Sequence, residues 1–265
     1  MLPRKKFNWK VFFTIWIGTI LGVVAILPYS LALQGAALEK MTLQIPLPLL
    51  ITIQLGENAV MFGIAALIGL FLANRIGLGA PILEGLFAHQ KVIDRVKAFI
   101  VPSIGLGVAA SLVIIALDVL VFSPALKAEL GVLANGLSQS NATPAAWQGF
   151  LASFYGGIDE EVLLRLFLLT LLAWLGKFVS HTPEGKPTLT VLWIANILAA
   201  ILFGLGHLPT TAMLIPLTPL VIVRAIVLNG LAGLAFGYLY WKHGIESAML
   251  SHFSADLVLH VLFAI

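Results

Sequence analysis

Three short motifs place ionisable side chains inside long apolar stretches of this chain. In the first, Asp159, Glu160, Glu161 and Arg165 lie within one run of mostly apolar residues. Glu161 and Arg165 are four positions apart, so on a helix they share a face and can pair. Glu160 points about 100° away from that face and has no local counter-charge. It can therefore face a wet cavity as a general base; the alternative is that the acids form a structural network.

The other two motifs supply imidazoles and a further carboxylate. Phe203 and His207 are four positions apart, and His207 stands where an apolar stretch ends. A single histidine there can equally be an interfacial residue. His252, Asp256 and His260 form a stripe with four-residue spacing. His252 and Asp256 can bind one metal ion, or the carboxylate can fix the imidazole tautomer. His260 is close to the chain end, and we expect it to lie outside the site.

Together, the motifs contain the groups needed to activate a water molecule for hydrolysis. A charge at the centre of a bilayer costs about 2.5–3.5 kcal/mol on insertion scales, so these residues need a partner or a function. An ion or proton transporter is the main alternative, but we see no inverted repeat in the sequence. A non-catalytic scaffold or immunity protein would not need to keep every acid. Arg224 is a further isolated charge whose partner the sequence does not indicate.

Composition identifies the elements that must position these residues. Of the 265 residues, 60% are hydrophobic and only 10% are charged, against roughly 25% charged in soluble domains. We expect an all-α, polytopic transmembrane bundle surrounded by lipid, with no nucleic-acid partner. The absence of cysteine excludes disulfides and thiolate metal sites. Apolar runs predict about seven spans, with six to eight as the range, at 10–33, 48–74, 99–122, 147–176, 188–207, 217–241 and 245–265.

The spans divide into two parts of one integral domain. Residues 1–145 hold three spans and an expected interfacial helix at 83–97, where charges alternate with apolar residues at helical spacing. Residues 146–265 hold four spans and all three motifs. The stretch Asn135–Pro144 reads as an external loop. Pro216 and Pro219 can break the sixth span or add a re-entrant turn.

Basic residues predict the orientation. A cytoplasmic N-terminus puts eleven of the Lys and Arg residues of the loops and flanks in the cytoplasm and leaves only Lys40 and Lys127 outside. We therefore expect an integral protein of a bacterial- or archaeal-type plasma membrane. The eleven residues are Arg4, Lys5, Lys6, Lys10, Arg75, Lys91, Arg95, Lys97, Lys177, Lys186 and Lys242.

The three motifs, in this order on successive apolar stretches, resemble the CPBP family of CAAX proteases and bacteriocin-processing or Abi-type membrane proteins, over about 154–257. The resemblance implies an intramembrane endopeptidase acting on a membrane-anchored protein or peptide, such as a prenylated protein or a leader peptide. It implies that Glu160 activates water and that His207, His252 and Asp256 complete the site. It leaves open a metal-free glutamate mechanism, or a metalloprotease with Zn²⁺ or another divalent ion on those last three residues. Supporting roles fall to Glu161, Arg165 and Phe203.

Two departures from the family pattern concern packing and charge. Leu166 stands where many relatives have glycine, and Asp256 stands where prenyl-processing enzymes have asparagine. An ionised aspartate favours a metal or a charged imidazole more than asparagine does. The depths of the motifs also differ, because at 1.5 Å per residue His252 falls in the cytoplasmic third of its span, while Glu160 and His207 fall towards the outer ends of theirs. A single site therefore requires tilt, a later helix start, or a loop at 208–216.

Overall fold

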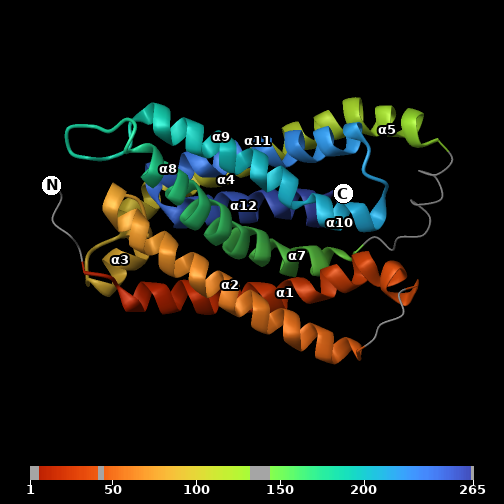
Figure 1. The fold of residues 1–265 in the computed structure, drawn as a ribbon, viewed down its shortest axis with the longest axis horizontal. Coiled ribbons are helices and arrows are strands. Elements are labelled where there is room, and N and C mark those ends of the chain that lie inside the picture. The colour runs from red at the N-terminus through yellow and green to blue at the C-terminus, as the bar shows by residue number, and fades with distance from the viewer. Residues whose placement is uncertain (1–5, 41–44, 132–143, 264–265) are drawn as a thin grey trace.

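The structure is a computed structural model that describes residues 6–40, 45–131 and 144–263, with the side chains of 35–40 left out. It is a bundle of long helices that run along one axis (Figure 1). Within the described residues, the β-structure is a single bridge between His181 and Pro187. The helices are α1 (Trp9–Lys40), α2 (Leu47–Ile76), α3 (Pro81–Phe87), α4 (Ile93–Leu117), α5 (Ser123–Leu130), α7 (Ala146–Phe154), α8 (Thr170–Gly176), α9 (Leu189–Gly206), α10 (Leu208–Leu214), α11 (Pro219–His243) and α12 (Ile245–Asp256); the π-helical segments are η1 (Asp118–Phe122), η2 (Tyr155–Glu160), η3 (Val162–Leu169) and η4 (Leu257–Leu262).

The prediction of an all-α, polytopic membrane bundle is confirmed. Five stretches of the described residues are long and apolar enough to cross a membrane: 9–34, 47–76, 93–130, 189–214 and 219–243. The two other predicted spans fall on helical stretches that carry most of the motif residues. One runs through α7, η2, η3 and α8, and the other through α12 and η4.

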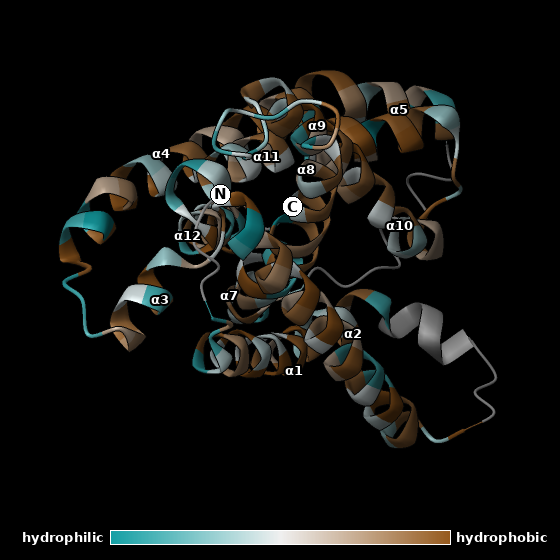
Figure 2. Ribbon diagram, turned by 60° about the vertical axis from the view of Figure 1, so that its left-hand side comes forward, coloured by the Kyte–Doolittle hydropathy of each residue, from teal (hydrophilic) through white to brown (hydrophobic). Residues whose placement is uncertain are grey.

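The surface and interior have the distribution expected of a protein in lipid. Large apolar side chains such as Val101, Leu120 and Val60 are exposed on the outside of the bundle. Apolar residues run the length of the long helices (Figure 2). The interior instead buries polar residues, among them Ser103, Ser111 and Asn196. Lipid is as apolar as a leucine side chain, so polar contacts between helices are part of what fixes the packing.

Several helix boundaries follow from prolines, threonines and glycines. The Thr188 and Thr218 hydroxyls accept hydrogen bonds from the backbone N–H of the third residue on, which caps the starts of α9 and α11. Gly77, at φ 79°, ends α2. Thr188, Thr218 and Gly77 thus fix the ends of three spans.

Two segments differ from the sequence expectation. The helix expected over 83–97 is instead α3 and the first turn of α4, separated by a turn in which His89 has φ 54°. A non-glycine residue with positive φ cannot continue a helix. The loop expected at 208–216 contains the short helix α10. The loop expected at Asn135–Pro144 lies, except for its last residue, outside the described residues.

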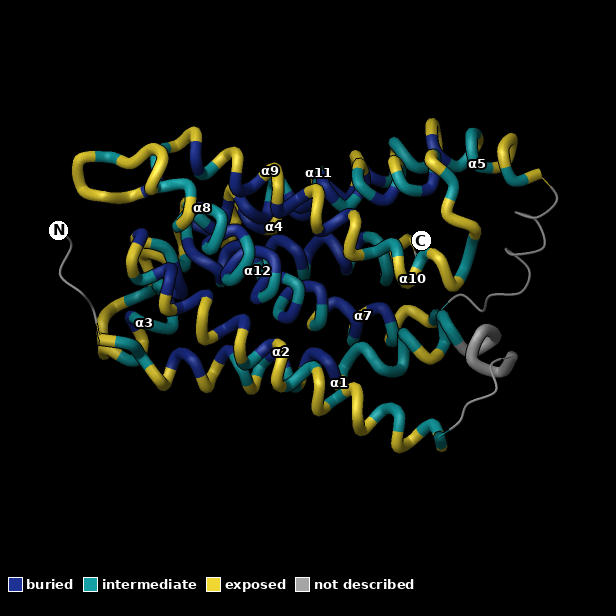
Figure 3. The backbone as a smooth tube through the Cα atoms, in the orientation of Figure 1, coloured by how far each residue is buried: buried dark blue, intermediate teal, exposed yellow. Residues whose placement is uncertain are grey.

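Helix α12 is the centre of the packing that positions the site. It lies between α4, α11, α7 and η2, while α1 packs on α2 and α7. Buried residues gather around α12 in the middle of the bundle (Figure 3). A side chain at Gly107 of α4 would overlap the backbone carbonyl of Ser251. The glycine therefore allows α4 and α12 to approach at backbone distance.

Leu166, one of the two departures from the family pattern, is accommodated by the neighbouring helix. Its side chain is fully buried. A Cβ at Gly69 of α2 would stand 2.6 Å from the backbone oxygen of Leu166. The glycine missing from this helix is thus matched by a glycine on the facing one, and close packing is kept.

Candidate active site

The first motif lies in a helix whose turns are widened. From Tyr155 to Leu169 the chain is π-helical except at Glu161. Wide turns of this kind are frequent at functional sites. They direct three consecutive acids into different surroundings: Asp159 and Glu161 are fully buried, whereas the side chain of Glu160 is 22% exposed. Glu160 lines a large cavity, as its missing counter-charge predicts.

Glu161 contacts a residue of its own helix and a residue of α12. Its Oε1 atom lies 2.8 Å from Nη1 of Arg165, as the spacing predicts. The contact is an ion pair whose angles do not meet the criteria for a hydrogen bond. The same oxygen accepts a 2.8 Å hydrogen bond from Nδ1 of His252 on α12. A buried carboxylate is tolerated where charge and hydrogen bonds compensate it. Glu161 therefore orients the imidazole.

The other nitrogen of His252 faces two carboxylates. Its Nε2 atom lies 3.6 Å from Oε2 of Glu160 and 3.6 Å from Oδ1 of Asp256. Gly156 leaves the space for this arrangement, because a Cβ there would overlap Asp256 and stand 3.1 Å from His252 Nε2. Glu160 and His252 thus meet despite the depths estimated from their spans.

Aromatic rings hold His252 on its remaining sides. Phe236 stacks on the imidazole with ring centroids 4.5 Å apart, and Phe203 meets it edge-on at 5.7 Å. The Arg165 guanidinium lies 4.7 Å from the Phe203 ring centroid and 5.3 Å from that of Phe236. Cation–π contacts of this kind stabilise a buried arginine. Sequence reasoning identified Phe203 but missed Phe236, which sits in a span with no other motif.

His207 reaches the site from the end of α9. Its Nδ1 atom donates a 2.8 Å hydrogen bond to the carbonyl of Phe203, whose ring contacts it edge-on at 4.9 Å. Since a carbonyl can only accept, Nδ1 carries the proton and Nε2 remains available. His207 lines the same cavity as Glu160, His252 and Asp256. Phe203 therefore contacts both imidazoles and links the second motif to the third.

The cavity itself is large and mixed in character. Its volume is about 1040 Å³, and its lining includes every residue named as catalytic from the sequence. A volume of this order exceeds a typical small-molecule pocket of roughly 300–1,000 Å³. It has room for a stretch of peptide.

The structure shows the partners of two residues, His260 and Arg224, whose surroundings the sequence did not indicate. His260 also lines the cavity. Its Nδ1 lies 3.4 Å from the Tyr29 hydroxyl and its Nε2 lies 4.0 Å from Oδ1 of Asp256. The expectation that it lies outside the site is therefore wrong, because η4 holds its ring at the cavity beside Tyr29 of α1. Arg224 donates two hydrogen bonds to Asp118, at 2.6 and 3.0 Å.

Asp159 is a buried acid to which sequence reasoning assigned no role. It is fully buried, and neither carboxylate oxygen has a hydrogen-bond partner among the described residues. It faces α1, where a Cβ at Gly22 would overlap the carboxyl group. The signal available in the sequence was its position beside Glu160 and Glu161. Asp159 thus packs between η2 and α1 and does not line the cavity.

The proposed metal ligands do not form a metal-binding group as placed here. Among the described residues, no three His, Asp or Glu side chains come together in a way that could hold an ion. Nδ1 of His252 donates to Glu161 and Nδ1 of His207 donates to a carbonyl, so each ring presents only its Nε2 atom as a donor to an ion. With no such group among the described residues, this arrangement favours the metal-free glutamate mechanism.

Comparison with known proteins agrees with the order of the motifs. The family model described as type II CAAX prenyl endopeptidase Rce1-like matches residues 142–258. No curated protein and no solved structure matches the chain. The matched segment begins just before α7, ends after Asp256 and so contains all three motifs. By this match, the C-terminal part of the chain resembles the Rce1-like family of CAAX-type membrane endopeptidases, which confirms the resemblance predicted from the three motifs.

Proposed function

We propose that this protein is an intramembrane endopeptidase that uses Glu160 to activate water. The observation that carries the proposal is the position of Glu160, which lines the cavity 3.6 Å from Nε2 of His252. The other nitrogen of that imidazole is bonded to Glu161, which in turn pairs with Arg165. One carboxylate is thus free to take a proton while its neighbour only orients.

The chemistry follows from the protonation state that each contact requires. Glu160 takes a proton from water, and the hydroxide adds to the carbonyl carbon of the scissile peptide bond. His252 and His207 present Nε2 atoms to the cavity. They position the water when neutral and donate to the oxyanion when protonated. When the C–N bond breaks, Glu160 returns the proton to the leaving amine, which restores the carboxylate.

Asp256 acts through His252 in this scheme. Its Oδ1 atom lies 3.6 Å from Nε2 of the imidazole. An ionised carboxylate there favours the cationic ring that the oxyanion needs. Asp256 and His207 are proposed here as parts of the site and not as metal ligands. The substrate class is a membrane-anchored protein or peptide, including prenylated and leader peptides.

The experiment compares two glutamates of the same cavity. Glu160→Gln keeps the shape of the side chain but removes the base, and Glu57→Gln changes a cavity-lining glutamate on α2. Purified protein in detergent is assayed on a panel of membrane-tethered peptides. We expect the Glu160→Gln rate to fall by at least roughly 10²-fold, with an unchanged melting temperature, and the Glu57→Gln rate to stay near wild type. A Glu160→Gln protein that cleaves normally would contradict the proposal and favour transport or scaffolding.

A further inference from the structure

The basic residues that set orientation gather at one end of the bundle. The start of α1, α3 and the connection between α8 and α9 all lie at the left of Figure 1. Contacts tie this end together: Nη1 of Arg95 donates to the Pro81 carbonyl, the N–H of Ile245 donates to the Gly79 carbonyl, and Lys186 lies beside Gly77. By the positive-inside rule, this end faces the cytoplasm.

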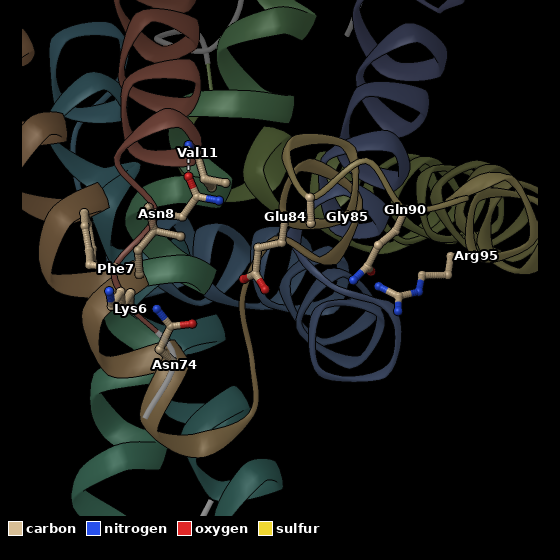
Figure 4. Close-up of a pocket in the computed structure, with 11 residues that line it drawn as sticks. Lys6, Phe7, Asn8, Val11, Asn74, Glu84, Gly85, Gln90 and Arg95 are labelled. Carbon is tan, nitrogen blue, oxygen red and sulfur yellow. Dashed lines mark hydrogen bonds between the residues drawn. The ribbon is translucent and has the colours of Figure 1, made fainter. Parts of the chain in front are cut away.

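A separate polar pocket occupies that cytoplasmic end. Its volume is about 360 Å³, and its lining includes Lys6, Asn8, Asn74, Glu84 and Arg95 (Figure 4). None of the residues that line it also lines the catalytic cavity. The cytoplasmic pocket is therefore not the mouth of the site.

The interior between the site and the cytoplasmic end is filled. Leu169, Ala173 and Ile245 have no exposed surface, and Tyr240 is 1% exposed. The Tyr240 hydroxyl lies 2.6 Å from the hydroxyl of Thr170, which joins α11 to α8 across this layer. A packed layer with its polar groups paired leaves no path for a peptide.

The catalytic cavity extends in the opposite direction. Its lining comes from the second half of α1, the first half of α2, η1, α10 and the start of α11. Those segments form the end of the bundle at the right of Figure 1, where α5 and α10 lie. Gln54 and Thr210, on α2 and α10, line the cavity and are exposed. They mark its mouth.

We propose that the catalytic cavity opens to the non-cytoplasmic side, and that the substrate is a membrane-anchored peptide whose cleaved segment lies on that side. The outward opening is argued from the cavity and the charge distribution alone. The position of the cleaved segment also rests on the proposed function. The paired ions of Arg224 and Asp118 lie in the same wall, with Asn229. Polar groups there suit a hydrated peptide segment.

The test of the opening uses the absence of cysteine from the chain. Gln54→Cys and Thr210→Cys place a thiol at the mouth, and Glu184→Cys places one on the exposed α8–α9 connection as the matched control. Spheroplasts expressing each variant are treated with a membrane-impermeant maleimide before and after permeabilisation. We expect both mouth cysteines to react fully before permeabilisation and Glu184→Cys to react only after it. The reverse pattern, or mouth cysteines that react only after permeabilisation, overturns the proposal.

The substrate half is tested with two tethered reporters whose cleavable segments face opposite sides of the membrane. We expect cleavage of the external reporter only, and its loss in Glu160→Gln. Cleavage of the cytoplasmic reporter alone overturns the proposal. The same labelling pattern is expected in the Glu160→Gln background, since that change leaves the fold intact. Expected labelling without cleavage of either reporter would therefore count against the peptidase function, while the outward opening would stand.

Discussion

Nδ1 of His252 lies 2.8 Å from Oε1 of Glu161, although the two residues are 91 positions apart in the chain. A carboxylate can only accept, so this contact places a proton on Nδ1 and directs Nε2 towards Glu160. Arg165 shares the same oxygen of Glu161. One buried acid thereby fixes the imidazole and holds α12 against the helix that carries the base.

Replacing Glu161 alone should destabilise the protein more than replacing Glu161 and Arg165 together. Glu161→Gln leaves Arg165, which is 1% exposed, as a buried cation without its counter-charge. Uncompensated burial of this kind costs about 3–5 kcal/mol, whereas replacing both partners is often close to neutral. We expect a clear drop in melting temperature in Glu161→Gln and a smaller drop in the double variant Glu161→Met, Arg165→Met, in which apolar side chains of similar volume replace both partners. Thermal unfolding in detergent measures both.

Activity separates orientation from stability in the same variants. The double variant has no side-chain oxygen at position 161 to accept from Nδ1 of His252, so it should stay nearly inactive even where its melting temperature recovers. A double variant that is both stable and active would show that Glu161 does not orient the imidazole.

Gly156 makes a second prediction about the geometry of the site. A Cβ there would overlap the Asp256 carboxylate and stand 3.1 Å from His252 Nε2. A displacement of about 1 Å can cost roughly 10²-fold in rate, so Gly156→Ala should lose activity on that scale. Gly105→Ala is the control, because nothing lies within 4 Å of its added carbon. Steady-state rates decide, and an active Gly156→Ala enzyme would contradict the arrangement.

The sequence was most informative where local spacing determined the contact. The pair of Glu161 and Arg165 follows from four-residue spacing on one helix, and the exposure of Glu160 follows from the same helix. Contacts between helices did not follow. Neither the stacking of Phe236 on His252 nor the pairing of Arg224 with Asp118 has a signal in local spacing. These depend on helix tilt and rotation, which neighbouring helices set.

The depths of Glu160 and His252 in their spans were also estimated wrongly, because helix geometry and packing were not known from the sequence. Counting 1.5 Å per residue assumes straight α-helices. The π-helical turns of η2 and η3 widen the helix around Glu160. Small residues at Gly156 and Gly157 let it approach α12, where a Cβ at Gly157 would stand 3.0 Å from the Met249 carbonyl. Glu160 and His252 therefore meet at a level that the count does not give.

Chelation provides a third prediction. No three His, Asp or Glu side chains of the described residues form an ion-binding group. We expect phenanthroline or EDTA to leave the cleavage rate within about twofold of the untreated rate, since a metal-dependent hydrolase loses its activated water with its ion. A zinc peptidase in the same detergent is the control. Loss of activity on chelation, with recovery on adding Zn²⁺, would show that His207, His252 and Asp256 rearrange around a metal.

The fourth prediction concerns the departure at Leu166. A Cβ at Gly69 would stand 2.6 Å from the backbone oxygen of Leu166 and 3.0 Å from its Cγ. Overpacking of this kind typically costs about 1–3 kcal/mol, so Gly69→Ala should lower the melting temperature. Gly56→Ala on the same helix meets nothing within 4 Å and should not.

Adding Leu166→Gly to Gly69→Ala shows whether the Leu166 side chain or its backbone limits the space at Gly69. The closest atom is a backbone oxygen, which remains when the side chain is removed, so the double variant should not recover. Loss of the buried leucine should instead add a cavity cost of about 2–5 kcal/mol. Recovery of the melting temperature in the double variant would mean that the Leu166 side chain, and not the approach of the two backbones, limits the packing of α2 against η3.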